Sequence, residues 1–499
     1  MSIMITKKHF LPLGLLIIGA CSSSSHLQPD VPTSLSILSG DGQSGQVGSQ
    51  LADSVRVKVS DVGGNGVPGV GVNWSVLTGG GSVSPGSSVT NSSGIAAAAF
   101  TLGPAQGEQR AQAEAAGLTG SPAVITATGM PSSGGGGVTL SVVAGGNNVP
   151  DRYSSDLWVH GNYAYTGTWG FRNKLGNVFN IWSLDPSGAP TLAGSVTVPS
   201  IGTVSDLQVS DDGQLLVVSG ERGDEGGIYA YSLSDPAHPT FLDSALVGSP
   251  GVHTVTLAKI AGRNYAFAAR NPGFGGTSSD RPALVIYDVT QPATITRVAV
   301  VPVPANYGIH DTYVRDGLAF VFAWDTGMIL YDVGNGLRGG TPSNPVEVSR
   351  LVTAATSASS PAVHNGWWFH NPVSGENRYL FIGQEGPGII GSRSSGDIHV
   401  VDVSDLSHPV EVAFLHIDGA GTHNFWMDEG KQILYAAYYN AGVVALDVSG
   451  TLSGDLAGRV LSQLQVGGKN NTFTWGVQLA NGSLYAIDML SGLWQLKTQ

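Results

Sequence analysis

The sequence predicts an all-β protein, most of which forms a seven-bladed β-propeller. Three observations support this prediction. The chain of 499 residues contains 71 Gly and 26 Pro, and short runs rich in β-branched and aromatic residues alternate with turns. No long run with a helical period occurs beyond the extreme N-terminus. A unit of three short strands recurs at intervals of about 50–60 residues, the spacing expected of propeller blades.

The clearest copy of the unit is residues 421–449, GTHNFWMDEGKQILYAAYYNAGVVALDVS, which reads as three strands separated by the turns DEGK and NAG. Residues 308–334 repeat this pattern almost position for position. Looser copies begin near five further positions: Ser154, Val204, Gly251, Ala362 and Thr474. Another strand, usually introduced by proline, precedes each copy, so the sequence predicts seven blades of four strands.

The ring is expected to close with strands from both of its ends. Residues 138–144 have no three-strand unit before them, and the sequence ends after a third strand, GLWQLKTQ. We expect residues 138–144 to supply the missing outer strand of the last blade. This pairing would remove two exposed sheet edges.

Residues 1–20 are predicted to be a lipoprotein signal peptide. Lys7 and Lys8 precede a short apolar run at residues 10–18, which is too short for a permanent membrane span. Ile18-Gly19-Ala20-Cys21 resembles the lipobox of bacterial lipoproteins, which implies cleavage before Cys21 and acylation of its thiol and amine. Ser22, rather than Asp, follows, which by analogy with enterobacterial sorting favours the outer membrane, facing the periplasm or the cell surface. An ordinary secretory signal with an incidental cysteine is the alternative.

The segments around the first folded module are predicted to be flexible connections. Residues 21–32 form a polar tether that contains proline, and residues 130–137 (MPSSGGGG) form a Gly/Ser-rich linker. Cys21 is the only cysteine, so the mature protein is predicted to lack disulfides and to depend on β packing for its stability.

Residues 33–129 are predicted to form a separate all-β module. The sequence VPGVGVNWSVLTGGGSVSP, followed by TNSSGIAAAAFTLGP and a closing TATG, resembles the bacterial immunoglobulin-like domain of the invasin and intimin type. This resemblance implies a β-sandwich. Such modules usually act as spacers or adhesive stalks, and direct ligand binding is the alternative function.

Residues 138–499 are predicted to form the propeller, and their third strands resemble the LVIVD repeat of exported bacterial and archaeal proteins. Four segments carry the resemblance: LVIYDVT (284–290), MILYDVG (328–334), IHVVDVS (398–404) and VVALDVS (443–449). The aspartates of these segments are predicted to cap the turns that follow: Asp288, Asp332, Asp402 and Asp447.

A column of histidines is the candidate functional site. The first strand of each blade lines the channel of a propeller, so the residue that opens this strand lies at one mouth. Four consecutive blades place histidine there: His253, His310, His364 and His423. The following residues Asp311, Asn365 and Asn424 are predicted to hydrogen-bond the imidazoles and fix their tautomers. Loops at the same mouth contribute further polar groups: Glu221, Arg222, Arg270, Asp325, Glu385, Asn440 and Asp488.

Four convergent imidazoles suit one transition-metal ion such as Fe, Cu or Zn, whereas Ca and Mg prefer oxygen ligands. The iron-binding propellers of carotenoid oxygenases offer an architectural parallel. Two alternatives remain: a repeat-derived structural ring filled with water, and a metal-free ligand or catalytic site. His370 is a weaker extra candidate. Trp367, Trp368 and Trp426 are predicted to pack between blades, with an aromatic wall around a ligand as the alternative.

The composition and motifs leave two classes of function. Only 12% of the residues are charged and the net charge is −13, which argues against nucleic acid as the partner. HExxH, Walker and GxSxG motifs are absent. The first class is a lipid-anchored cell-envelope protein that displays its propeller on a stalk to a protein or small-molecule partner. The second class is a metal-dependent enzyme, an oxidoreductase that uses the histidine column.

Overall fold

The computed structural model describes residues 31–499 apart from 52, 104–106, 131–137, 171, 173, 186–187, 272–281, 305–307 and 355–360. The predicted signal peptide, Cys21, most of the tether and the linker lie outside the described residues. The chain divides into two compact units, Met1–Ser132 and Ser133–Gln499. Within the described residues, no helix has the length and apolar character needed to cross a membrane.

The first unit consists of two β-sheets that share one core. One sheet has the order β1 (Ser34–Ser39), β3 (Val55–Ser60), β7 (Ile95–Thr101), β5 (Ser82–Ser84). The other has the order β2 (Gln43–Gln46), β9 (Ala123–Met130), β8 (Gly107–Glu114), β4 (Gly71–Thr78), β6 (Ser87–Val89). Val57 and Phe100 of the first sheet and Trp74 and Ile125 of the second belong to the same buried cluster. The all-β prediction is confirmed for this unit, and its immunoglobulin-like character stays a prediction.

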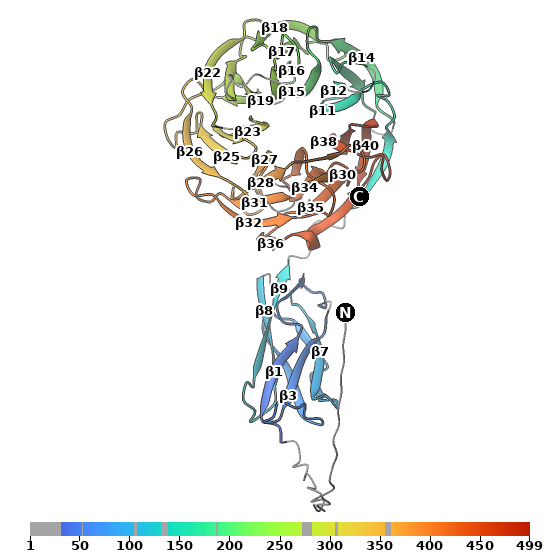
Figure 1. Ribbon diagram of the computed structural model, residues 1–499, viewed down its shortest axis with the longest axis vertical. Coiled ribbons are helices and arrows are strands. Elements are labelled where there is room, and N and C mark those ends of the chain that lie inside the picture. The colour runs from blue at the N-terminus through green and yellow to red at the C-terminus, as the bar shows by residue number, and fades with distance from the viewer. Residues whose placement is uncertain are drawn as a thin grey trace, which may run out of the picture. The chain divides into compact units, whose positions relative to one another are not determined.

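The described part of the second unit forms the seven predicted blades around a ring (Figure 1). Blade 1 consists, from the channel outward, of β11 (Tyr153–His160), β12 (Tyr163–Gly170), β13 (Val178–Ser183) and β14 (Thr191–Thr197). Blade 2 consists of β15 (Thr203–Val209), β16 (Leu215–Glu221), β17 (Gly227–Ser232) and β18 (Thr240–Leu246). Blade 3 consists of β19 (Val252–Ile260), β20 (Arg263–Arg270), β21 (Ala283–Asp288) and β22 (Thr296–Pro302). Blade 4 consists of β23 (Asp311–Arg315), β24 (Leu318–Phe322), β25 (Met328–Asp332) and β26 (Val346–Leu351).

The last three blades carry the additions to the basic pattern. Blade 5 consists of β27 (Val363–Phe369), β28 (Tyr379–Gln384), β31 (Ile398–Asp402) and β32 (Val410–Leu415), to which β36 (Gly454–Asp455) adds a short parallel pairing. The hairpin of β29 (Gly386–Ile389) and β30 (Arg393–Ser395) lies between β28 and β31 in the sequence. Blade 6 consists of β33 (Phe425–Asp428), β34 (Ile433–Ala437), β35 (Val443–Asp447) and β37 (Val460–Leu464), which a 3₁₀ turn, η2 (Ala457–Arg459), precedes.

Blade 7 confirms the predicted closure of the ring. Its strands are β38 (Thr474–Ala480), β39 (Ser483–Asp488), β40 (Gly492–Thr498) and, on the outside, β10 (Leu140–Gly145). β10 and β40 are antiparallel, and the pairing runs from Leu140 opposite Thr498 to Gly145 opposite Trp494. The last blade therefore combines strands from the two ends of the propeller.

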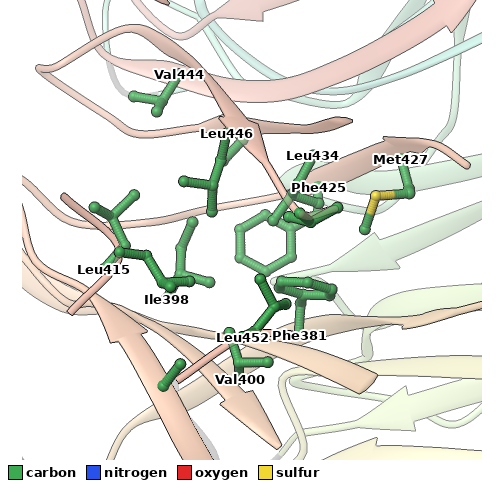
Figure 2. Close-up of a cluster of buried hydrophobic side chains, with 14 of the residues drawn as sticks. Phe381, Ile398, Val400, Leu415, Phe425, Met427, Leu434, Val444, Leu446 and Leu452 are labelled. Atoms are coloured by element: carbon green, nitrogen blue, oxygen red, sulfur yellow. The ribbon is translucent and has the colours of Figure 1, made fainter. Parts of the chain in front are cut away.

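The second and third strands of the blades are buried on both faces. All residues of β24 (LAFVF) and β25 (MILYD) are buried, so their sequences are continuous apolar runs instead of alternating ones. Apolar side chains of adjacent blades interlock, as Figure 2 shows for Phe381 and Val400 of blade 5 and Leu434 and Leu446 of blade 6. The core of the propeller therefore lies between its blades.

The repeat aspartates have the predicted capping role. In each turn, the carboxylate Oδ1 accepts a hydrogen bond from the backbone N–H two residues later, at 2.9–3.0 Å. These aspartates are Asp288, Asp332, Asp402 and Asp447. Asp332 accepts four further backbone N–H groups within its turn, and although burial opposes the shift, these bonds lower its pKa to about 2.

Removal of residues 493–499 is expected to destabilise the propeller. The truncation deletes most of β40, which leaves β10 without its partner and removes the buried Leu493 and Leu496. The milder substitution Leu496→Ala is expected to lower the free energy of unfolding by about 2–5 kcal/mol, measured by urea titration. Lys497→Ala, an exposed neighbour, is the matched control and is expected to leave stability unchanged. A truncated protein that melts like the full chain would disprove the role of this closure.

Candidate metal centre

The structure brings the four predicted histidines together at one mouth of the channel. Their exposed fractions are between 1% and 5%. Nε2 of His253 lies 3.0 Å from Nε2 of His310, and Nε2 of His364 lies 3.1 Å from Nε2 of His423. The rings of His310 and His364, which join these two pairs, have centroids 3.7 Å apart. Each of the two pairs thus meets through the Nε2 atoms of its imidazoles.

Backbone hydrogen bonds and strand register determine the position of each histidine in the cluster. The backbone N–H of His310 donates to the carbonyl of Phe322 at 2.7 Å, and that of His423 donates to the carbonyl of Ala437 at 2.8 Å. Around His253 and His364, the register between the first two strands of the blade shifts. Such bulges redirect side chains that strict alternation would send to opposite faces.

Two carboxylates complete the cluster. Glu385 Oε2 lies 3.4 Å from His310 Nε2 and 3.8 Å from His364 Nε2. Glu221 Oε1 lies 3.0 Å from His253 Nδ1. The hydroxyl of Tyr439 donates a short hydrogen bond to Glu385 Oε1. Glu385 therefore lies on the side of the cluster to which the Nε2 atoms point. Glu221 instead contacts Nδ1, the other ring nitrogen of His253.

Five of the polar residues predicted to lie at the mouth have other contacts or are exposed to solvent at least in part. Arg222 lies over the ring of Trp169, 4.9 Å from its centroid, and Asp488 accepts hydrogen bonds from the backbone around its own turn. Asn440 bonds to Ser394 and Gly419. Asp325 is exposed and Arg270 is half-buried. The sequence analysis did not select Tyr439. Like Glu221, this residue lies at the end of a predicted second strand, and that position was the only feature that could have identified it.

Burial keeps three of the imidazoles neutral. Desolvation, reinforced by the neighbouring histidines, lowers the pKa of His310 and His423 well below the usual range and that of His364 to about 3. For His253, burial acts in the same direction, but the charge and hydrogen bond of Glu221 outweigh it and raise the pKa. Neutral imidazole is the form that binds metals.

Several distances between ligand atoms are compatible with one metal ion, and among the described residues His310, His364 and Glu385 form the mutually close set. Ligands about 2.0–2.1 Å from one ion lie about 2.9 Å apart at right angles and about 3.4 Å apart at the tetrahedral angle. The two Nε2–Nε2 distances and the shorter Glu385 distance lie at or near these values. The ligand atoms of His310, His364 and Glu385 are all within 4.8 Å of one another.

The three residues predicted to support the imidazoles differ in their roles. Asn365 and Asn424 act against the effect of burial on the pKa of His364 and His423, but among the described residues Nδ1 of each of these histidines has no hydrogen-bond partner, so neither amide fixes a tautomer through that atom. The side-chain amide of Asn424 also donates to Asp156 Oδ2 at 3.0 Å. Asp311 points elsewhere, since its Oδ1 accepts the backbone N–H of Thr312 at 2.7 Å and its side chain lines the channel cavity.

An aromatic cavity of about 190 Å³ borders the cluster. His253, His310 and Glu385 form part of its lining, and Trp169 and Trp475 form part of its wall. Trp475, the residue of blade 7 at the position of the histidines, packs against His423 with the rings tilted by 40° and their centroids 4.1 Å apart. A small molecule in this cavity would contact imidazole, carboxyl and aromatic groups together.

The remaining candidates lie outside the cluster. Nε2 of His370 is 3.7 Å from Asp316, and the buried His399 pairs with Glu411 at 2.8 Å. The indole N–H of Trp368 donates to the carbonyl of Asn377, in agreement with its predicted packing role. Trp367 and Trp426 contact each other, with centroids 5.3 Å apart, and line the channel cavity.

Comparison with protein families identifies the repeat. The model of the LVIVD repeat matches residues 151–172 and 393–414. The second segment contains IHVVDVS, so the predicted resemblance is confirmed there, and the first covers β11 and β12. The chain therefore contains LVIVD repeats within a β-propeller. No curated protein sequence matches the chain.

Several solved structures are similar at low identity. Sqt1 of Saccharomyces cerevisiae is 11% identical, with 69% of this chain and 82% of that chain covered and a TM-score of 0.46. Sqt1 of Chaetomium thermophilum is 11% identical, with 70% and 82% covered and a TM-score of 0.48. The WD40 β-propeller domain of Doa1 is 10% identical, with 72% and 97% covered and a TM-score of 0.48. At these values the similarities carry no information on function.

The substitution His364→Gln tests whether the imidazole of His364 stays unprotonated in the folded protein. The unfolded state protonates histidine below about pH 6.5, whereas the folded state holds the pKa of His364 near 3. As the pH falls from about 7.5 to about 5, the metal-free wild type should therefore lose stability relative to the variant, by up to about 1.4 kcal/mol per pH unit. Urea titrations in chelator at several pH values measure this difference. Parallel curves through the acid range would show that folded His364 accepts a proton.

Proposed function

We propose that the propeller carries one transition-metal ion, Fe, Cu or Zn, held by His253, His310, His364 and His423. The observations that carry this proposal are the contacts of the four buried histidines through Nε2, at 3.0 Å in one pair and 3.1 Å in the other, and the ligand atoms of His310, His364 and Glu385 within 4.8 Å of one another. Imidazoles kept neutral by burial supply the lone pairs that such an ion needs. Glu385 is placed to act as a fifth ligand or as a proton acceptor for a bound molecule.

The cluster and its cavity suit chemistry on a small molecule. A bound ion would supply Lewis acidity or, for Fe or Cu, electron transfer. Burial raises the pKa of the Glu385 carboxyl group, and Tyr439 donates to its other oxygen, so this pair can hold a proton beside the cavity. These features favour a metal-dependent oxidoreductase over a purely structural ring of histidines.

Metal analysis of the protein purified without a polyhistidine tag tests this proposal. One equivalent of transition metal per chain is expected, and His310→Ala or His423→Ala is expected to reduce it at least tenfold, because each substitution removes one ligand. His399→Gln is the matched control, since His399 is equally buried but lies in another hydrogen bond, with Glu411. A folded protein that takes up no metal during reconstitution would refute the proposal.

A second proposal concerns the place of the protein in the cell and is compatible with a metal centre. We propose that Cys21 is lipidated and anchors the chain in a bacterial outer membrane. The lipobox-like Ile18-Gly19-Ala20-Cys21 supports this proposal. The two-sheet unit at residues 33–129, with its invasin-like motifs, would then act as an immunoglobulin-like stalk that displays the propeller to a protein or small-molecule partner.

Cys21→Ser is expected to release the protein from membranes. When the full chain is expressed in a Gram-negative host, the wild type should sediment with the outer membrane and incorporate a labelled fatty acid. The variant should lose the label and appear in the soluble fraction, because no thiol remains for acylation. Ser22→Ala is the matched control and should keep both the label and the membrane association. A variant that stays on the membrane would contradict the lipid anchor.

A further inference from the structure

A second cavity lies along the channel, separate from the aromatic cavity at the histidine mouth. Its volume is about 450 Å³, and side chains or backbone from all seven inner strands or their leading residues line it. This size is within the range of small-molecule sites. The histidines do not belong to its lining; the residues that follow them, such as Asp311 and Asn365, do.

Four aromatic rings form a continuous arc along one side of this cavity. Trp158 contacts Trp426 with centroids 5.9 Å apart, Trp426 contacts Trp367 at 5.3 Å, and Trp367 contacts Tyr313 at 5.4 Å. Each ring belongs to an inner strand of a different blade, and each is half-buried. All four residues line the cavity, so part of their remaining accessible surface faces it.

Acidic groups form the next tier of the channel, two residues earlier on the same strands. Asp156 precedes Trp158 and Asp311 precedes Tyr313 by this spacing, which places both members of each pair on one face of a strand. Asp206 joins them from blade 2 and hydrogen-bonds Asp156. In blade 7 a glycine occupies this tier; a Cβ on Gly476 would lie 2.5 Å from Asp156 Oδ1, so the glycine makes room for the carboxyl group.

These carboxyl groups lack a cation that balances them within the cavity. Oδ1 of each carboxyl group accepts a hydrogen bond from the backbone N–H of the next residue. Arg315 is the one cationic side chain among the lining residues that the structure describes, and it pairs with Glu429 at 2.6 and 3.2 Å. The exposed Asp211 adds a further acidic group where the cavity meets solvent.

From this combination we propose that the channel cavity binds a small organic ammonium ion, with its nitrogen near Asp156, Asp206 and Asp311 and its alkyl groups against the aromatic arc. Aromatic faces attract ammonium groups, most strongly where water is excluded. An inorganic cation has no need of the aromatic arc, and a neutral apolar molecule would make no ion pair with the carboxyl groups. An organic ammonium ion would contact both the carboxyl groups and the aromatic arc of the cavity. The site does not depend on the proposed metal centre.

Choline and its uncharged carbon analogue 3,3-dimethylbutan-1-ol are matched probes of this proposal. Calorimetric titration of the full chain in chelator is expected to show one choline site, with at least tenfold weaker binding of the alcohol. This comparison uses the wild type alone and does not depend on the folding of any variant. Equal binding of both probes, or no binding of choline at millimolar concentration, would overturn the proposal, and so would displacement of choline by an equal concentration of Na⁺ or K⁺.

Variants then locate the site. Asp311→Asn and Trp426→Leu are each expected to weaken choline binding at least tenfold, whereas Asp325→Asn, an exposed carboxylate of the same blade, should leave it unchanged. Glu385→Gln removes the carboxylate at the metal centre and should not alter choline binding. A folded wild-type protein that takes up no metal but binds choline would therefore refute only the metal proposal. Unchanged choline affinity in folded Asp311→Asn and Trp426→Leu would refute the channel site.

Discussion

The antiparallel pairing of β10 with β40 is the constraint on which the propeller depends. It joins strands that lie more than 340 positions apart in the sequence, and it turns a row of sheets into a closed ring. Once the ring is closed, the inner strand of every blade faces the same axis. Side chains with no relation in the sequence are then brought to within hydrogen-bonding distance of one another.

Closure of the ring also arranges the side chains that face the channel in layers of different chemistry. Each inner strand contributes one residue to each level of the channel, and the repeat aligns these residues in tiers. The first tier contains the four histidines, the second the buried aspartates and asparagines, and the third the arc formed by Trp158, Tyr313, Trp367 and Trp426. Bulges in the inner strands allow consecutive residues, such as His364 and Asn365, to belong to consecutive tiers.

The first two tiers differ in how burial acts on them. In the first, low polarity favours neutral imidazoles, which are ligands for a soft or borderline cation. In the second, the same low polarity raises the pKa of the carboxyl groups, which an organic cation would stabilise in their charged form. One desolvated channel can thus present two recognition surfaces of different chemistry. Most of the blade surfaces that surround it are apolar and serve packing alone.

The sequence was enough to predict the all-β class, the seven repeats, the closing strand, the capping aspartates and the histidine column. These features are local or periodic, so turns, strand propensity and spacing reveal them. Only the tertiary structure decided which loop carboxylates reach the histidines, since Glu221 and Glu385 do so while Asp325 and Asp488 do not. It also decided that Asp311 turns to the channel, that Tyr439 binds Glu385, and that Trp367 and Trp426 face a cavity. Such contacts depend on the curvature of the ring and on strand bulges, which shift side chains by ångströms. Neither feature produces a periodic pattern in the sequence, so neither could be predicted from it.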